Sequence, residues 1–216
     1  MNNLLQRGFE KFCWFVLHKY CRLETNCPQL PDAPFIVCAN HSSHIDTPAL
    51  MLGLNRPFQE FNMLAAKDHF QPNPNKRSFS QYLMNLILVD REAKPAELKR
   101  LIKECEQAKA QNKILIIYPE GKRSQDGQIH SFKPGTVYLA YKLNLPIIPA
   151  GIIGTGKALP KNHWFIRPNP IQIRFGEAIM PEHIVGLSQK QSLQALTTKL
   201  EESVKELLIQ KQPIQQ

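Results

Sequence analysis

Three continuous apolar runs set the strongest limit on what this chain can fold into. They cover residues 35–39, 113–118 and 145–153, are rich in β-branched side chains, and are bounded by turn residues. Runs of this kind are typical of strands that are buried on both faces of a sheet. Residues 61–66, 86–89 and 171–175 are weaker strand candidates.

Helical patterns separate these runs. Apolar residues recur at helical spacing between residues 95 and 110, and again after residue 188, where Ser188 and Gln191 form a candidate capping box. Strands that alternate with helices predict an α/β fold: a single domain with a mixed, largely parallel sheet flanked by helices. Prolines and asparagines predict a loop at residues 71–78.

Length and charge restrict the class of protein. The chain has 216 residues, enough for one sizeable core, and its 27 Lys and Arg against 18 Asp and Glu give a formal charge of +9. Such an excess would attract an anionic membrane, nucleic acid, an acidic carrier protein or a phosphorylated small molecule. The cations are scattered and no nucleic-acid recognition signature is present, so we expect no nucleic-acid partner.

The five cysteines, at positions 13, 21, 27, 38 and 105, contain no C-x-x-C pair. An odd number without paired spacing argues against a disulfide framework and against a zinc site. The pattern favours a reducing compartment.

The N-terminal segment, residues 1–24, has two open interpretations. Its apolar run, residues 12–17, is too short and too close to charged residues to span a bilayer, which needs ~20 mostly apolar residues. Aromatic side chains beside basic ones suit an amphipathic helix in a membrane interface, with Phe12, Trp14 and Phe15 inserted. The same aromatics could instead dock the helix on the domain formed by residues 25–216. A lipid contact would then fall near residues 61–70 or near Trp164.

Two of the strongest strand candidates each end in a burst of polar residues. Residues 35–39 run into Asn40–Thr47, and residues 113–118 run into a segment that ends at Ser124. In sheets of this kind, ligands bind where loops leave the carboxyl ends of strands. We therefore expect both bursts to meet in one cleft.

The first burst contains a candidate general base. His41 and Asp46 lie five residues apart, a separation that helical spacing alone does not bring together. With Thr47 as N-cap and Pro48 as first helical residue, Asp46 lies just outside the helix and can fold back on His41. A carboxylate that accepts from one imidazole nitrogen fixes the tautomer and raises the basicity of the other.

Other roles for this turn stay open. Asp46 could serve only as a helix cap, and His41 with His44 could ligate a metal, although the sequence offers no second cluster of ligands. Ser42 or Ser43 could be a nucleophile, but no G-x-S-x-G elbow surrounds either of them.

The second burst suits an anion. Glu120 is followed by Gly121, which lets a ligand approach closely, and by the cations Lys122 and Arg123. The cations could belong to an ordinary solvated turn. Beside a histidine base at a strand end, they predict a phosphate clamp, because the arginine fork suits bidentate phosphate binding. Lys133, at an expected helix start, adds an anion-binding position.

Four blocks of residues resemble the glycerolipid acyltransferases in order and spacing, and most of all the bacterial 1-acylglycerol-3-phosphate (lysophosphatidate) acyltransferases. The blocks are Asn40-His41-x4-Asp46, residues 120–124, Phe132-Lys133-x-Gly135 and residues 146–149. Lys67 and Asp90-Arg91 look like a further block that helps to bind phosphate. The resemblance runs from about residue 34 to residue 176.

This resemblance implies transfer of a fatty acyl group from acyl-CoA or acyl carrier protein to the sn-2 hydroxyl of 1-acylglycerol 3-phosphate or a related lysophospholipid. The product would be phosphatidate, in phospholipid biosynthesis. Transfer would be direct, without an acyl-enzyme, a metal or a bound cofactor. The enzyme would be peripheral, on the cytoplasmic face of an anionic membrane that holds its lipid acceptor.

The family's residue roles carry over to matching positions. His41, oriented by Asp46, would remove the proton of the acceptor hydroxyl. Glu120 would fix Arg123 or the glycerol. The expected substrate-binding set is Lys67, Arg91, Glu120, Gly121, Lys122, Arg123 and Lys133.

Two positions depart from the family pattern. Lys122 stands where threonine is usual, and Asn85 stands where glycine is frequent. Both positions fall in blocks that bind the acceptor. One alternative is a thioesterase or related hydrolase, which would use the same base on water. A second is a basic nucleic-acid-binding module, which the scattered cations do not favour.

Overall fold

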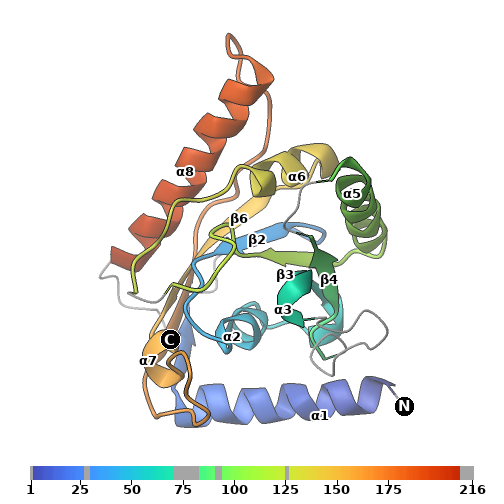
Figure 1. The fold of residues 1–216 in the computed structure, drawn as a ribbon. Helices are drawn as coiled ribbons and strands as arrows, with labels where there is room; N and C mark the ends of the chain where they lie inside the picture. The colour runs from blue at the N-terminus through green and yellow to red at the C-terminus, as the bar shows by residue number, and fades with distance from the viewer. Residues whose placement is uncertain (1, 27–29, 71–82, 91–93, 125–126, 210–216) are drawn as a thin grey trace.

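The computed structural model describes residues 2–26, 30–70, 83–90, 94–124 and 127–209. Figure 1 shows one sheet with helices on both faces. The strands are β1 (Leu23–Thr25), β2 (Ile36–Ala39), β3 (Phe61–Ala66), β4 (Leu86–Val89), β5 (Ile114–Ile117), β6 (Ile147–Ile153) and β7 (Ile171–Phe175). The helices are α1 (Asn2–Trp14), α2 (Asp46–Gly53), α3 (Lys67–Phe70), α5 (Pro95–Ala110), α6 (Gly135–Leu143), α7 (Thr155–Ala158) and α8 (Gln189–Ile209), with the π-helix η1 (Phe15–Tyr20) and the 3-10 helix η2 (Phe58–Glu60).

The strands form a single sheet in the order β1-β7-β6-β2-β5-β3-β4. All neighbours are parallel except β6 and β7, which are antiparallel. The predicted mixed, largely parallel sheet is confirmed. Every predicted strand is present, but β1 was missed, because a three-residue strand is recognisable only from its pairing with β7.

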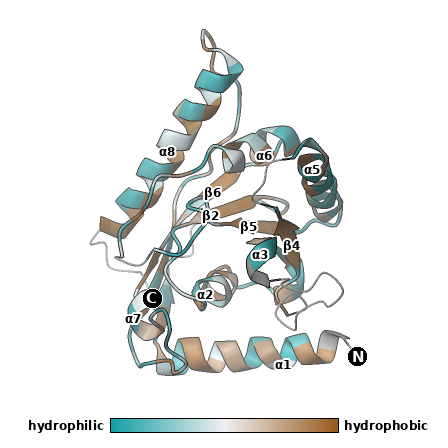
Figure 2. Cartoon of the chain, in the orientation of Figure 1, coloured by the Kyte–Doolittle hydropathy of each residue, from teal (hydrophilic) through white to brown (hydrophobic). Residues whose placement is uncertain are grey.

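Alternate residues of the central strand face two separate hydrophobic cores. In β2, Val37 and Ala39 belong to the core that packs against α1 and α2, whereas Ile36 and Cys38 belong to the core that packs against α5, α6 and α8. A strand covered on both faces is apolar at every position, so its sequence shows an uninterrupted run. In Figure 2 the strands form a hydrophobic layer between helices with mixed surfaces.

The termini of two helices test the capping predictions. The capping box of α8 is confirmed: the Ser188 N–H donates to Gln191 Oε1 at 2.9 Å, and the Gln191 N–H donates to Ser188 Oγ at 3.4 Å. The predicted start of α2, with Thr47 as N-cap and Pro48 first, is wrong by two residues. The helix begins at Asp46, because its carboxylate closes the turn before it and a carboxylate in the first turn favours the helix.

Helix α1 is docked on the core by one face and exposes apolar side chains on the other. Cys13 and, in η1, Leu17 are buried, and the Phe9 ring meets the Phe58 ring edge-on with centroids 6.0 Å apart. The exposed large apolar side chains of this segment are Leu4, Leu5, Phe12, Trp14 and Phe15. Docking of the helix therefore leaves an apolar face uncovered.

The N-terminal segment is continuous with the sheet. The division proposed at residue 24 falls inside β1, which pairs with β7. Across the described ranges, no helix combines the length and the apolar character needed to cross a membrane.

The sheet brings the two polar bursts together. β2 and β5 are parallel neighbours, with Cys38 beside Ile117, so their carboxyl ends lie at the same edge. There, the Ser124 N–H donates to the His41 carbonyl oxygen at 2.7 Å. The expected meeting of the two segments is confirmed.

Asn85 has a structural role that explains one departure from the family pattern. Its backbone is left-handed, with φ of 48°, and its side-chain amide donates to the carbonyl oxygens of Phe58 at 3.1 Å and Phe61 at 3.0 Å. Glycine and asparagine tolerate this conformation better than other residues do. Asparagine thus keeps the backbone that glycine permits, and adds a tie between the start of β4 and the start of β3.

We predict that Asn85→Ala lowers the free energy of unfolding by about 2–3 kcal/mol, because alanine loses the amide donors and disfavours positive φ. Asn85→Gly should cost less, since glycine removes only the hydrogen bonds. Urea unfolding of both variants measures the difference. An equal loss in the two variants would contradict the backbone explanation.

Candidate active site

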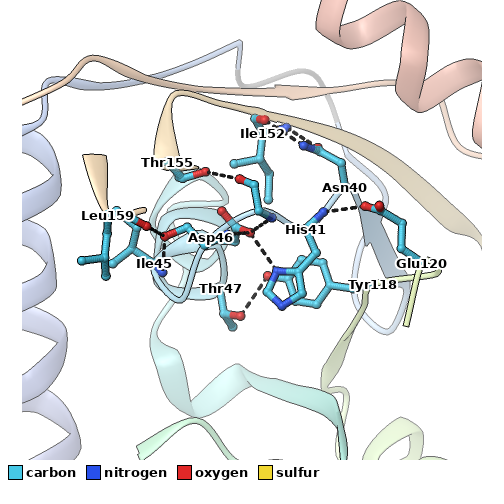
Figure 3. A network of polar contacts seen from close by, with 12 residues as sticks. Asn40, His41, Ile45, Asp46, Thr47, Tyr118, Glu120, Ile152, Thr155 and Leu159 are labelled. Carbon is cyan, nitrogen blue, oxygen red and sulfur yellow. Dashed lines mark hydrogen bonds and ion pairs between the residues drawn. The ribbon is translucent and has the colours of Figure 1, made fainter. Parts of the chain in front are cut away.

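The turn after β2 is fixed at its first residue. Asn40 is buried, and its side chain donates to the Ile152 carbonyl oxygen at 3.0 Å and accepts from the Ile152 N–H at 2.8 Å. Figure 3 shows this pair of bonds linking the turn to β6. The side chain thus continues the pairing of β2 with β6 one residue beyond the strand. It thereby fixes the backbone position of the next residue, His41.

One oxygen of Asp46 organises the turn. Asp46 Oδ2 accepts from the Ser42 N–H at 2.7 Å, from the Ser43 N–H at 2.8 Å and from His41 Nδ1, also at 2.8 Å. The carboxylate has no solvent exposure, so these donors replace the water that it lost on folding. Within the described part of the chain, Oδ1 has no hydrogen-bond partner.

The His41 ring is held from a second direction. It stacks on the ring of Tyr118 with centroids 4.0 Å apart and an interplanar angle of 14°. The Tyr118 hydroxyl is hydrogen-bonded to Thr47 Oγ1 at 2.8 Å. Burial, with the nearby Asp46 carboxylate, raises the pKa of Tyr118 well above its ordinary value, so the phenol stays protonated.

These contacts define the state of the imidazole. Asp46 accepts a hydrogen bond only if His41 Nδ1 carries the proton, which leaves Nε2 as the basic nitrogen. The His41 side chain is 17% exposed and lines the large cavity of the molecule. The predicted pairing of His41 with Asp46 is therefore present in a form that suits a general base.

Glu120 connects the two loops. Its carboxylate accepts from the His41 N–H at 2.8 Å through Oε1 and from the His130 N–H at 3.1 Å through Oε2. Burial raises the pKa of Glu120 above its usual range, and the two backbone donors oppose that rise. Both carboxylate oxygens thus hold backbone groups in place.

Gly121 allows the loop to pass close to a cation. Its φ is 72°, and a Cβ built there would lie 3.0 Å from Lys133 Nζ. Lys122 and Lys133 are exposed, Arg123 is half-buried, and all three line the same cavity as His41. Among the described residues none of these three cations forms an ion pair, so their charge can meet a ligand.

The cavity has a volume of about 840 Å³, within the usual range for small-molecule sites. Most of the other lining residues are apolar, although Asp90 and Glu97 also line the cavity, and many of the apolar ones come from β3, β4, α5 and α6. The wall includes Leu64, Ala66, Leu86, Val89, Leu98, Leu101 and Leu139. The cavity therefore suits a ligand that joins an anionic group to a long apolar chain.

The predicted site residues fall into four groups. His41, Gly121, Lys122, Arg123 and Lys133 line the cavity, and Asp46 and Glu120 support it from behind. Lys67 is the first residue of α3 and is not part of the cavity lining. Arg91 lies outside the described residues.

Tyr118 and the apolar wall were missed by the sequence analysis. An aromatic residue directly before the second polar burst was the one signal for Tyr118. Its stacking partner, His41, lies in the loop after another strand, so the signal could not identify the contact. The wall residues were assigned to the core, because apolar residues that face a cavity and those that face a core have the same spacing.

Nucleophiles other than a substrate hydroxyl are poorly placed. Ser42 Oγ is bonded to Thr155 Oγ1 at 3.0 Å, and Ser43 Oγ donates to the Leu159 carbonyl at 2.8 Å. The cysteines at positions 13, 21, 38 and 105 are buried, and burial raises the pKa of each thiol. Cys13 lines the cavity, but burial raises the pKa of its thiol to about 12, so it is not an activated nucleophile.

The described residues contain no group of three or more His, Cys, Asp or Glu side chains arranged to hold a metal ion. His41 Nδ1 is engaged by Asp46, and His44 is exposed. The arrangement of His41 and Asp46 is that of a base with its orienting carboxylate.

Comparison with known proteins identifies related sequences and folds. The family model described as Acyltransferase matches residues 20–153, more than half of the chain. A 1-acyl-sn-glycerol-3-phosphate acyltransferase of Pseudomonas aeruginosa is 27% identical over 187 residues, which are 87% of this chain and 68% of that protein. A 1-acyl-sn-glycerol-3-phosphate acyltransferase of Chlamydomonas reinhardtii is 28% identical over 152 residues, 70% of this chain.

The chain covers 44% of the length of the algal protein, so it spans less than half of that relative. The crystal structure of the 1-acyl-sn-glycerophosphate acyltransferase from Thermotoga maritima superposes with a TM-score of 0.68 and 24% identity. The match covers 98% of this chain and 83% of that one. This likeness concerns the fold.

We predict that ¹⁵N NMR of His41 shows a neutral ring protonated at Nδ1, because Asp46 Oδ2 is an acceptor. In Asp46→Ala the ring should shift toward the Nε2–H form that free imidazole favours. Asp32→Ala, at an exposed carboxylate, is the control and should leave the spectrum unchanged. A wild-type ring protonated at Nε2 would contradict the geometry of the pair.

Proposed function

Because the chain belongs to the acyltransferase family, we propose that it transfers a fatty acyl group from a thioester to the sn-2 hydroxyl of 1-acylglycerol 3-phosphate, giving phosphatidate. The donor is acyl-CoA or acyl carrier protein. The reaction belongs to phospholipid biosynthesis, as the names of the relatives suggest.

One observation carries this proposal: a single cavity holds an oriented base, cations that form no ion pair with other described residues, and a largely apolar wall. The acceptor has the same three parts, a hydroxyl, a phosphate and an acyl chain. Arg123 and Lys122, with Lys133, are the groups that would bind the phosphate. Arg91 and Lys67 stay candidates for this role through the resemblance alone.

The chemistry follows from the His41–Asp46 pair. His41 Nε2 removes the hydroxyl proton as the acceptor oxygen attacks the thioester carbonyl carbon. The new C–O bond forms, the C–S bond breaks, and the departing thiolate takes the proton back from the imidazolium. Asp46, 2.8 Å from Nδ1, stabilises the imidazolium while it exists.

Transfer is direct in this proposal. The engaged hydroxyls of Ser42 and Ser43 and the buried thiols support it, because an acyl-enzyme needs an activated protein nucleophile. The steps require neither a metal nor a bound cofactor.

The enzyme works at the surface of a membrane, since its acceptor carries a long acyl chain. The exposed aromatic face of α1 and the formal charge of +9 support peripheral attachment to an anionic surface. Phe12, Trp14 and Phe15 would insert, at the cytoplasmic face. The docked face of the same helix means that α1 cannot be deleted to test this without exposing core.

The decisive experiment offers the purified protein a panel of lysophospholipids with acyl-CoA or acyl carrier protein, and identifies products by mass spectrometry. We expect phosphatidate only when thioester and lysophosphatidate are both present, and no effect of EDTA. Free fatty acid formed at the same rate without an acceptor would instead identify a thioesterase.

In the same assay, His41→Ala and Asp46→Asn should lower turnover about 10²–10⁴-fold, the range expected for loss of a general base. Their unfolding curves should stay cooperative. His183→Ala, at an exposed histidine outside the cavity, is the matched control and should keep full activity. Near-normal turnover of His41→Ala would mean that another group acts as base.

A second prediction concerns the acceptor. Arg123→Ala should raise the KM for lysophosphatidate roughly tenfold or more and change the KM for the thioester much less, because a charge-assisted contact with the phosphate is lost. Arg56→Ala, which breaks an exposed ion pair with Glu60, is the control. An unchanged acceptor KM in Arg123→Ala would place the phosphate elsewhere.

A further inference from the structure

The loop between α7 and β7 exposes two adjacent large aromatic side chains that the fold does not use. Trp164 is 93% exposed and Phe165 is 86% exposed. Isolated exposed apolar residues are common, but two neighbouring aromatic rings held almost entirely in water indicate a contact surface.

The charges of this loop suit an anionic surface. Lys161, His163 and Arg167 are exposed, and residues 160–170 contain no acidic residue. Tryptophan and phenylalanine flanked by cations are typical of segments that lie at the headgroup level of a bilayer. A protein-binding loop would more often carry charges of both signs at its rim.

The loop lies beside the N-terminal segment. The Cys21 thiol contacts the Arg167 carbonyl oxygen at 3.8 Å, and the Ile171 N–H donates to the Cys21 carbonyl oxygen at 3.1 Å. Figure 1 shows α1 and the loop after α7 along the same edge of the molecule. The exposed aromatic side chains of the N-terminal segment and those of the loop therefore lie at the same end of the protein.

Part of the rim of the cavity lies at this end. Phe12 of α1 and Lys161 of the loop are both exposed, and both line the cavity that contains His41. An exposed lining residue lies at the rim of a cavity, so α1 and the loop form part of the rim, as the exposed Lys122 and Lys133 do. A lipid that leaves a bilayer touched by both elements would reach the cavity without crossing water.

We infer that residues 160–167 form a second contact with an anionic lipid surface, with Trp164 and Phe165 inserted among the headgroups and Lys161 and Arg167 against the lipid phosphates. The inference rests on the proposed function, since a lipid acceptor is what requires the cavity to open toward a bilayer. Together with α1, this contact fixes the orientation of the protein and not only its attachment.

The base of the loop connects this contact to the catalytic turn. The Leu159 carbonyl oxygen accepts from Ser43 Oγ at 2.8 Å, and Thr155 Oγ1 bonds Ser42 Oγ at 3.0 Å. Insertion of the loop into a membrane would thus fix the distance between the His41 turn and the lipid surface.

The two tryptophans of the chain allow each contact to be observed separately. Trp14→Phe leaves Trp164 as the one fluorophore of its kind, and Trp164→Phe leaves Trp14. With anionic vesicles that contain brominated phospholipid, we expect quenching and a blue shift of the emission in both variants. Quenching of Trp14 with no change at Trp164 would overturn the inference.

A double variant, Trp164→Ala with Phe165→Ala, should weaken partitioning into anionic vesicles by about tenfold or more, because two large apolar side chains no longer insert. Val185→Ala is the matched control, since Val185 is 96% exposed and precedes α8, which Figure 1 places away from α1. Unchanged partitioning of the double variant would contradict the second contact.

Failure of this inference and failure of the proposed function give different results. Activity on detergent-dispersed lysophosphatidate tests the chemistry, and the double variant should keep it, because neither ring lines the cavity. If the wild-type protein shows no such activity, the proposed function fails, while the fluorescence and partitioning measurements still decide the membrane contact.

Discussion

The structure of the site depends on one buried carboxylate oxygen. Asp46 Oδ2 accepts from His41 Nδ1 and from the backbone N–H groups of Ser42 and Ser43, and no solvent reaches it. A buried carboxylate needs such donors, so the closed turn and the Asp46 carboxylate stabilise each other. The same bonds hold the imidazole in one tautomer, with Nε2 toward the cavity. The same carboxylate oxygen thus orients the base and stabilises the turn, so loss of Asp46 would affect both.

The topology of the sheet brings the other parts of the site together. β2 and β5 are parallel neighbours, so the loops at their carboxyl ends share one edge, and Glu120 joins them through the backbone of His41 and His130. The cavity that His41 lines also contains the cations and apolar residues from β3, β4, α5 and α6. A substrate with an anionic head and an acyl chain would be placed across the base by these two surfaces together, which is the positioning that acyl transfer to a hydroxyl requires.

Much of this could be predicted from the sequence, for identifiable reasons. Buried parallel strands appear as continuous apolar runs, and strand ends rich in polar residues mark the edge where ligands bind, so the fold, the cleft and the His41–Asp46 pair followed. The sequence placed Lys67 in a block that resembles a phosphate-binding motif. Membership of such a block does not determine whether a residue lines the cavity, and Lys67 does not. The hydrogen bonds of Glu120 and the stacking of Tyr118 on His41 depend on contacts between loops that are distant in sequence. The start of α2 was misplaced, because the carboxylate of Asp46 overrode the usual signals of Thr47 and Pro48.

The central claim is that one cavity places the acceptor hydroxyl at His41 while cations hold its phosphate. A crystal structure of the full chain with 1-acylglycerol 3-phosphate bound tests it most directly. The account predicts the sn-2 hydroxyl within hydrogen-bond distance of His41 Nε2, the phosphate at Arg123 and the acyl chain along the apolar wall. A bound acceptor whose hydroxyl lies away from His41, or whose phosphate lies outside the cation cluster of Lys122, Arg123 and Lys133, would contradict it.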